Sequence, residues 1–161
     1  GVHSNGYSLG RRIGERSGLG WNAACPWDED TLGAALLAPT RLYVRPVLGA
    51  LAGGGVRALA HVTGGGLTEN VPRVLPEGLG AEIDLGAWRL PAVFRWLAET
   101  GGMAEAELLK TFNAGIGMVV AVAPDRAERV AQGLRDAGEH VHQIGHVVPG
   151  DGTVRYIGRL L

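Results

Sequence analysis

Cysteine is almost absent from this sequence, which contains a single residue of that type, Cys25. One cysteine cannot form an internal disulfide, and this fits a reducing compartment such as the cytosol. No apolar stretch approaches the roughly 18 residues that a membrane-spanning helix needs. The first residues also lack the basic and then apolar pattern of a secretory signal. We therefore expect a cytoplasmic protein with no membrane partner.

A strong excess of either charge is also missing. Fifteen Lys and Arg stand against sixteen Asp and Glu, which leaves a formal net charge of −1. Nucleic acids and anionic membranes attract basic patches, so neither is expected as a main partner. The acidic run Asp28–Asp30 is interpreted as a solvated turn, because consecutive carboxylates do not converge on one metal ion.

The length of 161 residues fits one domain with a substantial core, and there is no internal repeat. Apolar periodicity and Gly and Pro positions predict helices over residues 7–19, 31–37, 46–53, 67–74, 91–101, 104–110 and 124–137. Strands are predicted over residues 41–45, 56–63, 81–85, 117–123, 141–148 and 153–160, the last two forming a hairpin through Pro149–Gly152. These elements predict an α/β fold, a single mixed β-sheet covered by helices, partly ferredoxin-like in its β-α-β pieces.

The most informative segment runs from His61 to Pro76. It begins as the end of an apolar strand, passes the three glycines Gly64, Gly65 and Gly66, and enters a short helical pattern. Glycines allow the backbone to turn through positive φ and bring N–H groups close to a bound group. A strand, a glycine turn and a helix start together suit a phosphate. The pattern is neither a GxGxxG motif nor a P-loop, so a tight connection without a ligand is the alternative.

The amino-acid sequence of this segment resembles that of aminoimidazole ribonucleotide synthetase, also called phosphoribosylformylglycinamidine cyclo-ligase, of purine biosynthesis. Three further blocks resemble the same family in the same order, and they are Gly1–Leu9 (GVHSNGYSL), Leu37–Val44 (LAPTRLYV) and Thr111–Met118 (TFNAGIGM). Four ordered blocks over most of the chain form a specific signal. The resemblance implies the fold of the family's C-terminal domain, in which the same ferredoxin-like elements occur.

The resemblance covers only the C-terminal half of a two-domain enzyme. In the family the N-terminal half carries the principal ATP- and Mg²⁺-binding residues and much of a homodimer contact, and it has no counterpart here. Residue 1 lies inside a family motif, and there is no initiator Met. We therefore expect a separate C-terminal domain, spanning residues 1–161, whose own share is to hold the substrate. The partners implied are formylglycinamidine ribonucleotide, ATP and the N-terminal half of the same enzyme.

His3, Ser4 and Asn5 place three polar side chains just before a helix. A helix cap by Ser4 or Asn5 would account for one of them, whereas the resemblance implies that this motif lines the active-site cleft. We expect at least one to hydrogen-bond polar groups of the substrate.

The other candidates lie at element ends, where α/β proteins place their ligands. His61 ends a strand and fits either a structural role or a phosphate donor, and Glu69 fits either a first-turn acid or a partner of an amidine. The predicted substrate-binding residues are His3, Ser4, Asn5, His61, Thr63, Gly64, Gly65, Gly66, Asn70 and Asn113. The pattern assigns no residue as acid or base, and no metal ligand.

Three histidines, His140, His142 and His146, share parity along a predicted strand and invite a zinc interpretation. His146 would lie about 13 Å from His142 on an extended strand, which is too far for one tetrahedral ion. No cysteine or carboxylate nearby completes a ligand set, so a metal site is not expected.

The predicted function is that of the ATP-dependent cyclo-ligase that converts formylglycinamidine ribonucleotide to aminoimidazole ribonucleotide. One alternative is another two-domain, ATP-dependent relative, such as formylglycinamidine ribonucleotide synthase, thiamine-monophosphate kinase or selenophosphate synthetase. The other is a non-catalytic phosphate-binding or assembly domain, which this chain would resemble when isolated.

Overall fold

The computed structural model describes all residues from Gly1 to Leu161. Its α-helices are α1 (Tyr7–Arg16), α2 (Leu32–Leu36), α3 (Val44–Ala52), α4 (Gly66–Asn70), α5 (Ala92–Gly101), α6 (Glu105–Thr111) and α7 (Ala127–Asp136). The strands are β1 (Val56–His61), β2 (Leu79–Asp84), β3 (Met118–Val122), β4 (Gly145–Pro149) and β5 (Val154–Ile157). Short 3-10 helices occupy Pro72–Val74, Leu85–Ala87 and Pro124–Arg126. No helix is both long enough and apolar enough to cross a membrane.

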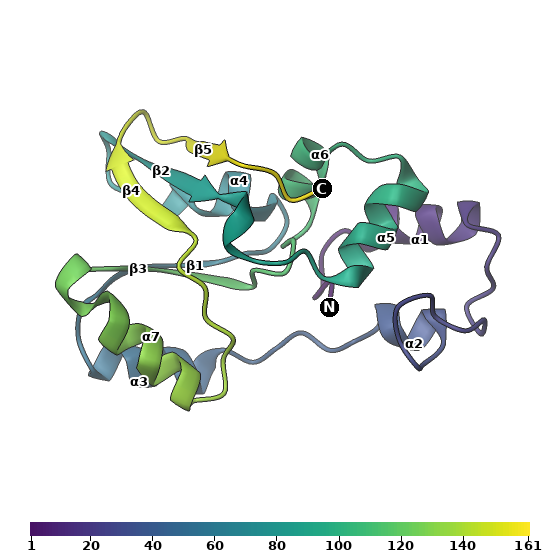
Figure 1. Ribbon diagram of the computed structural model, residues 1–161, viewed down its shortest axis with the longest axis horizontal. Coiled ribbons are helices and arrows are strands. Elements are labelled where there is room, and N and C mark those ends of the chain that lie inside the picture. Colours follow the sequence, from purple (N-terminus) through teal and green to yellow (C-terminus); the bar gives the residue numbers. More distant parts are fainter.

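The strands form two sheets, so the predicted α/β class is confirmed while the single sheet is wrong (Figure 1). One sheet is the antiparallel pair β1–β3, and the other has the order β4-β2-β5. The predicted strand over residues 141–148 is regular only from Gly145, and residues 141–144 have no regular structure. Since they do not pair with β3, nothing joins the two sheets into one.

The predicted hairpin between the last two strands is also wrong. Strand β2 lies between them, antiparallel to β4 and parallel to β5. The connecting loop passes over the start of β2, where the N–H groups of Gly150 and Gly152 donate to the carbonyls of Gly78 and Leu79 at 3.0 Å. These donors thus stabilise a crossing, and a tight turn between adjacent strands does not form.

Two further elements differ from the prediction. Residues 41–45, predicted as strand, enter helix α3 at Val44, because Pro46 is compatible with a first helical turn and the two residues before it join that turn. The helix predicted over residues 67–74 is divided into α4 and the 3-10 turn at Pro72, whose ring has no N–H to continue the α-helical bonding.

The core is a cluster of 22 buried apolar residues contributed mainly by α5, α6, β2 and the segment after β1. Phe94 and Phe112 lie at its centre, with ring centroids 5.8 Å apart. Helix α5 buries the predicted positions Val93, Phe94 and Leu97, and α1 packs along it (Figure 1). Helices α3 and α7 pack against each other beside the β1–β3 pair, at the opposite end of the molecule from α1, α2 and α5.

Candidate functional site

The segment between β1 and α4, Thr63–Gly66, is called the glycine turn here. Gly65 has φ +97° and Gly66 has φ +56°, so both adopt the left-handed region that favours glycine. A Cβ on Gly66 would lie 2.0 Å from the carbonyl oxygen of Leu109 at the end of α6, and one on Gly65 would lie 2.7 Å from the Glu69 carboxylate. Gly64 is different: its φ is not positive, and the nearest atom to an added Cβ is Asn5 Oδ1 at 3.6 Å.

Asn70 holds the glycine turn from beneath. Its buried side chain donates to the carbonyls of Gly66 at 2.8 Å and Gly64 at 3.2 Å. Its Oδ1 accepts from Thr63 Oγ1 at 3.3 Å and from Arg73 at 3.2 Å. Every hydrogen-bonding atom of the Asn70 amide is therefore engaged within the fold, and so is the Thr63 hydroxyl.

The turn leaves several backbone donors free. The amide N–H groups of Gly64, Gly65, Leu67 and Thr68 donate to no group of the chain. Beside them, the Glu69 carboxylate lies 3.4 Å from Arg73 and 3.8 Å from Lys110. An anion at the turn would thus meet free N–H groups and a carboxylate already paired with two cations, which reduces its repulsion.

The first of the segments that resemble the family, Gly1–Leu9, lies against this turn. Asn5 Oδ1 is next to Gly64, and Ser4 is exposed. Helix α1 begins after Gly6, whose left-handed conformation starts the helix with no capping side chain. The capping role that would explain Ser4 or Asn5 structurally is therefore not found, and neither side chain forms a hydrogen bond within the fold.

His3 and His61 lie on either side of Tyr43, and the three residues are called the His-Tyr-His cluster here. The ring centroids of Tyr43 are 6.0 Å from His3 and 5.8 Å from His61. A Cβ on Gly117 would lie 1.8 Å from the Tyr43 hydroxyl and 2.6 Å from His3 Cε1. Gly117 thus gives both side chains the room to lie directly on the backbone at the start of β3.

His3 is held in an unusual state. It adopts φ +56° although it is not glycine, its side chain is buried, and its Nδ1 has no hydrogen-bond partner. Burial lowers the pKa of His3, and the neighbouring His61 lowers it further. Burial also raises the pKa of the Tyr43 hydroxyl, with an added effect of Glu139. Both groups are therefore favoured in their neutral forms.

Asn113 organises the fourth of the segments that resemble the family, Thr111–Met118. Its Oδ1 accepts from Gly115 N–H at 2.8 Å, and its Nδ2 donates to the Gly1 carbonyl at 3.2 Å. Ala114 is fixed in the left-handed region at φ +50°, with its carbonyl bound by Trp88 Nε1 at 2.9 Å. Asn113 is thus engaged within the fold and positions the turn that leads to Gly117.

All four motifs meet in this region. The Val62 N–H donates to the Gly117 carbonyl at 2.9 Å and joins the third motif to the fourth. Gly6 of the first motif leaves room only for the Phe112 ring of the fourth, and Tyr43 brings in the second. The structure therefore assembles one constellation from segments more than a hundred residues apart in sequence.

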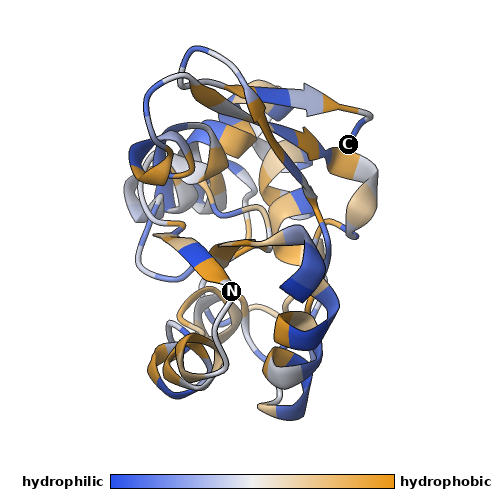
Figure 2. Cartoon of the chain, turned by 90° about the vertical axis from the view of Figure 1, so that its left-hand side faces the viewer, coloured by the Kyte–Doolittle hydropathy of each residue, from blue (hydrophilic) through white to orange (hydrophobic).

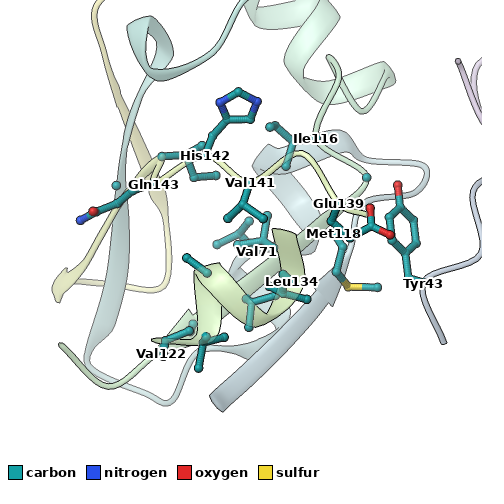
Figure 3. A pocket seen from close by; sticks show the side chains of 18 of the residues that line it. Tyr43, Val71, Ile116, Met118, Val122, Leu134, Glu139, Val141, His142 and Gln143 are labelled. Atoms are coloured by element: carbon teal, nitrogen blue, oxygen red, sulfur yellow. The ribbon is translucent and has the colours of Figure 1, made fainter. Parts of the chain in front are cut away.

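A cavity of about 880 Å³ opens from the same region, between β3, α7 and residues 139–147 (Figure 3). Its walls are mostly apolar, with Met118, Val122 and Leu134 among them, and His3 and Tyr43 lie at one end. There, Arg41 binds Glu139 at 2.7 Å and the Gly138 carbonyl at 2.7 Å. The glycine turn and His61 do not line this cavity, whereas His3 and Tyr43 of the His-Tyr-His cluster do.

The three histidines near the C-terminus do not gather. His146 lies on β4 opposite Glu82, whereas His140 and His142 precede the strand, and all three are among the residues that line the cavity, His142 being labelled in Figure 3. No group of three or more His, Cys, Asp or Glu side chains in the structure is placed to hold a metal ion.

Comparison with known proteins assigns the family. Residues 1–158 match the family described as AIR synthase related protein, C-terminal domain. The chain belongs to this family. The predicted membership of the wider AIR synthase-related superfamily is thereby confirmed.

Solved structures agree on the fold. The Escherichia coli hydrogenase maturation protein HypE superimposes with a TM-score of 0.64 at 24% identity, over 99% of this chain and 47% of that one. A second structure of a hydrogenase maturation protein HypE gives a TM-score of 0.57 at 20% identity, over 95% and 46%. The family member described here thus spans about half the length of these relatives.

Tyr43 lies between His3 and His61 but is not among the substrate-binding residues predicted from the sequence. It lies inside the second motif, and an aromatic residue there was interpreted only as part of a strand. Two features of the sequence pointed to it: Tyr43 lies within Leu37–Val44, one of the segments that resemble the family, and Gly117, which makes room for its side chain, lies in another. No local pattern indicates that these two segments touch.

The three glycines of the turn should respond differently to substitution. Gly66→Ala should lower the free energy of unfolding by about 1–3 kcal/mol or more, because it places a Cβ against the Leu109 carbonyl at positive φ. Gly64→Ala should change it by less than about 0.5 kcal/mol. Urea unfolding of the two variants measures this difference, and equal losses would contradict the geometry.

The state of His3 predicts a pH dependence. Its pKa is lowered in the folded chain, so below pH 6.5 the unfolded chain binds a proton that the folded chain resists. The free energy of unfolding of residues 1–161 should therefore fall as the pH drops below the ordinary value near 6.5. His3→Asn keeps a residue that tolerates positive φ and removes the titration, so its curve should be flatter. Identical pH dependence in both proteins would refute the assignment.

Proposed function

We propose that this chain is the C-terminal, substrate-holding domain of aminoimidazole ribonucleotide synthetase. The whole enzyme would convert formylglycinamidine ribonucleotide and ATP to aminoimidazole ribonucleotide, ADP and phosphate. In that reaction ATP phosphorylates the formyl oxygen, an amidine nitrogen attacks the same carbon, and phosphate leaves as the five-membered ring closes. Such chemistry depends on holding the reacting groups in register and on stabilising charge.

The observation that carries the proposal is the meeting of the four motifs that resemble the cyclo-ligase. They were identified by wording alone, and in the fold they surround one place through His3, Asn5, Tyr43, Gly64 and Gly117. Within this region the buried His3 Nδ1 has no hydrogen-bond partner in the fold. Ser4 and Asn5 are at least partly exposed and cap no helix, so their side chains are free to bind a substrate.

Within this region the residues divide into two roles. Asn70, Thr63 and Asn113 are engaged by the backbone they hold, so we assign them to positioning. The free N–H groups of the glycine turn are assigned to the ribose 5′-phosphate, and Asn5 and Ser4 to neutral polar groups of the substrate. His3 and His61 remain candidates to form hydrogen bonds at the reacting end, since their ring nitrogens can donate or accept.

ATP and Mg²⁺ are assigned mainly to the half of the enzyme that precedes Gly1. This assignment follows from the resemblance to the two-domain family, and no group of three or more His, Cys, Asp or Glu side chains in this chain is placed to hold a metal ion. The relatives are about twice as long as this chain, which leaves room for a second domain. That half would also supply the homodimer contact, and the assembled enzyme is expected in the cytoplasm.

Other members of the superfamily are the competing candidates. The likeness to HypE is a likeness of fold at under 25% identity, and it does not favour that protein's role over the cyclo-ligase. A non-catalytic phosphate-binding domain is the candidate from a different class. The amino-acid sequence from Thr63 to Pro76 resembles the cyclo-ligase more than the other superfamily members, and it therefore favours the cyclo-ligase over these and over a non-catalytic domain.

An assay of the full-length protein decides among them. With formylglycinamidine ribonucleotide, ATP and Mg²⁺, it should form aminoimidazole ribonucleotide and ADP in equal amounts, whereas residues 1–161 alone should form neither. Turnover with thiamine monophosphate, with selenide, or with glutamine and formylglycinamide ribonucleotide would instead identify another superfamily activity. Failure with every substrate would favour a binding domain.

Asn5 separates a substrate contact from a structural role. In the full-length enzyme, Asn5→Ala should lower kcat/KM by about 2- to 13-fold, which corresponds to a lost hydrogen bond of about 0.5–1.5 kcal/mol. The melting temperature should hardly change, because Asn5 caps no helix. Ser8→Ala, at an exposed position of α1, is the matched control and should leave both quantities unchanged. A lower melting temperature with intact kcat/KM would show that Asn5 is structural.

A further inference from the structure

The hydroxyl of Thr68, on helix α4, connects this helix to α6. Its Oγ1 donates to the Leu109 carbonyl at 3.3 Å. No backbone N–H donates to that carbonyl, because it lies in the last turn of α6, where helical carbonyls have no intrahelical partner. The same carbonyl oxygen is the atom that lies against Gly66. Thr68 therefore binds the group on which the glycine turn packs.

Tyr156, on strand β5, binds the same hydroxyl. The Tyr156 and Thr68 hydroxyl oxygens are 2.9 Å apart. Since the single hydroxyl proton of Thr68 is directed to Leu109, Tyr156 is the donor in this pair. Burial raises the pKa of Tyr156, although the bond to Thr68 partly offsets this effect, and the hydroxyl keeps the proton that it donates. Two consecutive hydrogen bonds thus run from the last strand through α4 to α6.

The alternation of β5 directs Tyr156 toward the interior. Val154 and Tyr156 are half-buried, whereas Arg155 is exposed and pairs with Glu82. Figure 2 shows hydrophilic and hydrophobic residues mixed along the strands beside the C-terminus, as in a sheet with one face toward solvent. The Tyr156 ring packs against the main core. Tyr156→Phe would keep this packing and remove only the hydroxyl.

A threonine in a helix has another partner for its hydroxyl, which is the carbonyl three or four residues earlier. For Thr68 these carbonyls belong to Gly65 and Gly64, both within the glycine turn. The Gly64 carbonyl already accepts from Asn70 at 3.2 Å, so a Thr68 hydroxyl turned back would compete with a bond that holds the turn. The bond from Tyr156 favours the orientation toward α6, and this competition is avoided.

We propose that Tyr156 is a positioning residue of the glycine turn and acts through Thr68. Its hydroxyl holds Thr68 on the Leu109 carbonyl, and the contact of that carbonyl with Gly66 fixes the turn in its left-handed conformation. The effect on the turn stands on these contacts alone. Its consequence for the ribose 5′-phosphate rests on the proposed function.

Amide hydrogen exchange in the full-length protein measures the effect on the turn. The Gly66 N–H donates to the Thr63 carbonyl at 3.0 Å, and the Glu69 N–H donates to the Gly65 carbonyl at 3.1 Å. Exchange of these two amides reports local opening of the turn. Tyr156→Phe should speed both by about 3- to 10-fold, which is the effect of one lost hydrogen bond.

Tyr7→Phe is the matched control. It also removes a half-buried tyrosine hydroxyl from its acceptor, the Leu36 carbonyl at 2.9 Å, and it should change exchange in the glycine turn by less than about two-fold. Thr68→Val keeps the side-chain shape and removes the hydroxyl. If Tyr156 acts through Thr68, exchange in the double variant should be no faster than in Thr68→Val alone.

Three results would overturn the proposal. They are unchanged exchange in Tyr156→Phe, equal acceleration in Tyr7→Phe, and a double variant in which the two single effects multiply. The first would show that the hydroxyl does not hold the turn, and the second that any lost tyrosine hydroxyl loosens it. The third would show that Tyr156 acts by a route other than Thr68.

Steady-state kinetics of the full-length enzyme measures the consequence for substrate binding. Tyr156→Phe should raise KM for formylglycinamidine ribonucleotide by about 3- to 10-fold and change kcat by less than about two-fold, because the turn holds a part of the substrate that does not react. Faster exchange with an unchanged KM would reject the assignment of the phosphate to the glycine turn and retain the positioning role. A protein without cyclo-ligase activity would reject the proposed function and leave the exchange result standing.

Discussion

The arrangement of the site depends on close backbone approach at a few glycines. Gly66 brings the glycine turn within reach of the Leu109 carbonyl, where only a hydrogen atom fits. Gly6 does the same against the Phe112 ring, and Gly117 does so beneath the His-Tyr-His cluster. Because Leu109 and Phe112 belong to the main core, the first two of these contacts fix their motifs to that core. The polar groups around Gly64 inherit their positions from that packing.

A division of labour among polar side chains follows from this scaffold. Asn70 and Asn113 are buried and use their amides to hold backbone turns, whereas Asn5 is half-buried and has nothing to hold. Buried polar groups without partners are costly, and His3 Nδ1 is one. Strain and unpaired groups concentrate where a protein binds its ligand. The contrast between these three asparagines therefore distinguishes residues that hold the backbone from a residue free to bind a ligand, which the sequence of the motifs alone does not do.

Local pattern was sufficient for most elements and insufficient for their pairing. The strands near residues 56–63, 81–85 and 117–123 and the helices around Phe94 and Val130 follow from periodicity. The order β4-β2-β5 does not, because the partners of β2 lie far along the chain and a Pro-Gly-Asp-Gly segment has the composition of a hairpin. The three glycines of the turn also look equivalent in sequence. Only the neighbouring carbonyl of Leu109 makes Gly66 the most constrained of them, and only the fold brings Tyr43 onto Gly117.

The place of β2 in its sheet has a consequence for how the protein is made. Both partners of β2 are synthesised long after it, and the Glu82–Arg155 ion pair joins residues 73 positions apart. At about 5–20 residues per second, the ribosome needs roughly 4–15 s to bring β5 out behind β2. Throughout that interval the nascent chain carries an apolar strand with two open edges, Ala81 and Ile83 included. Both edges stay open to non-native pairing until β4 and β5 have been translated and cover them.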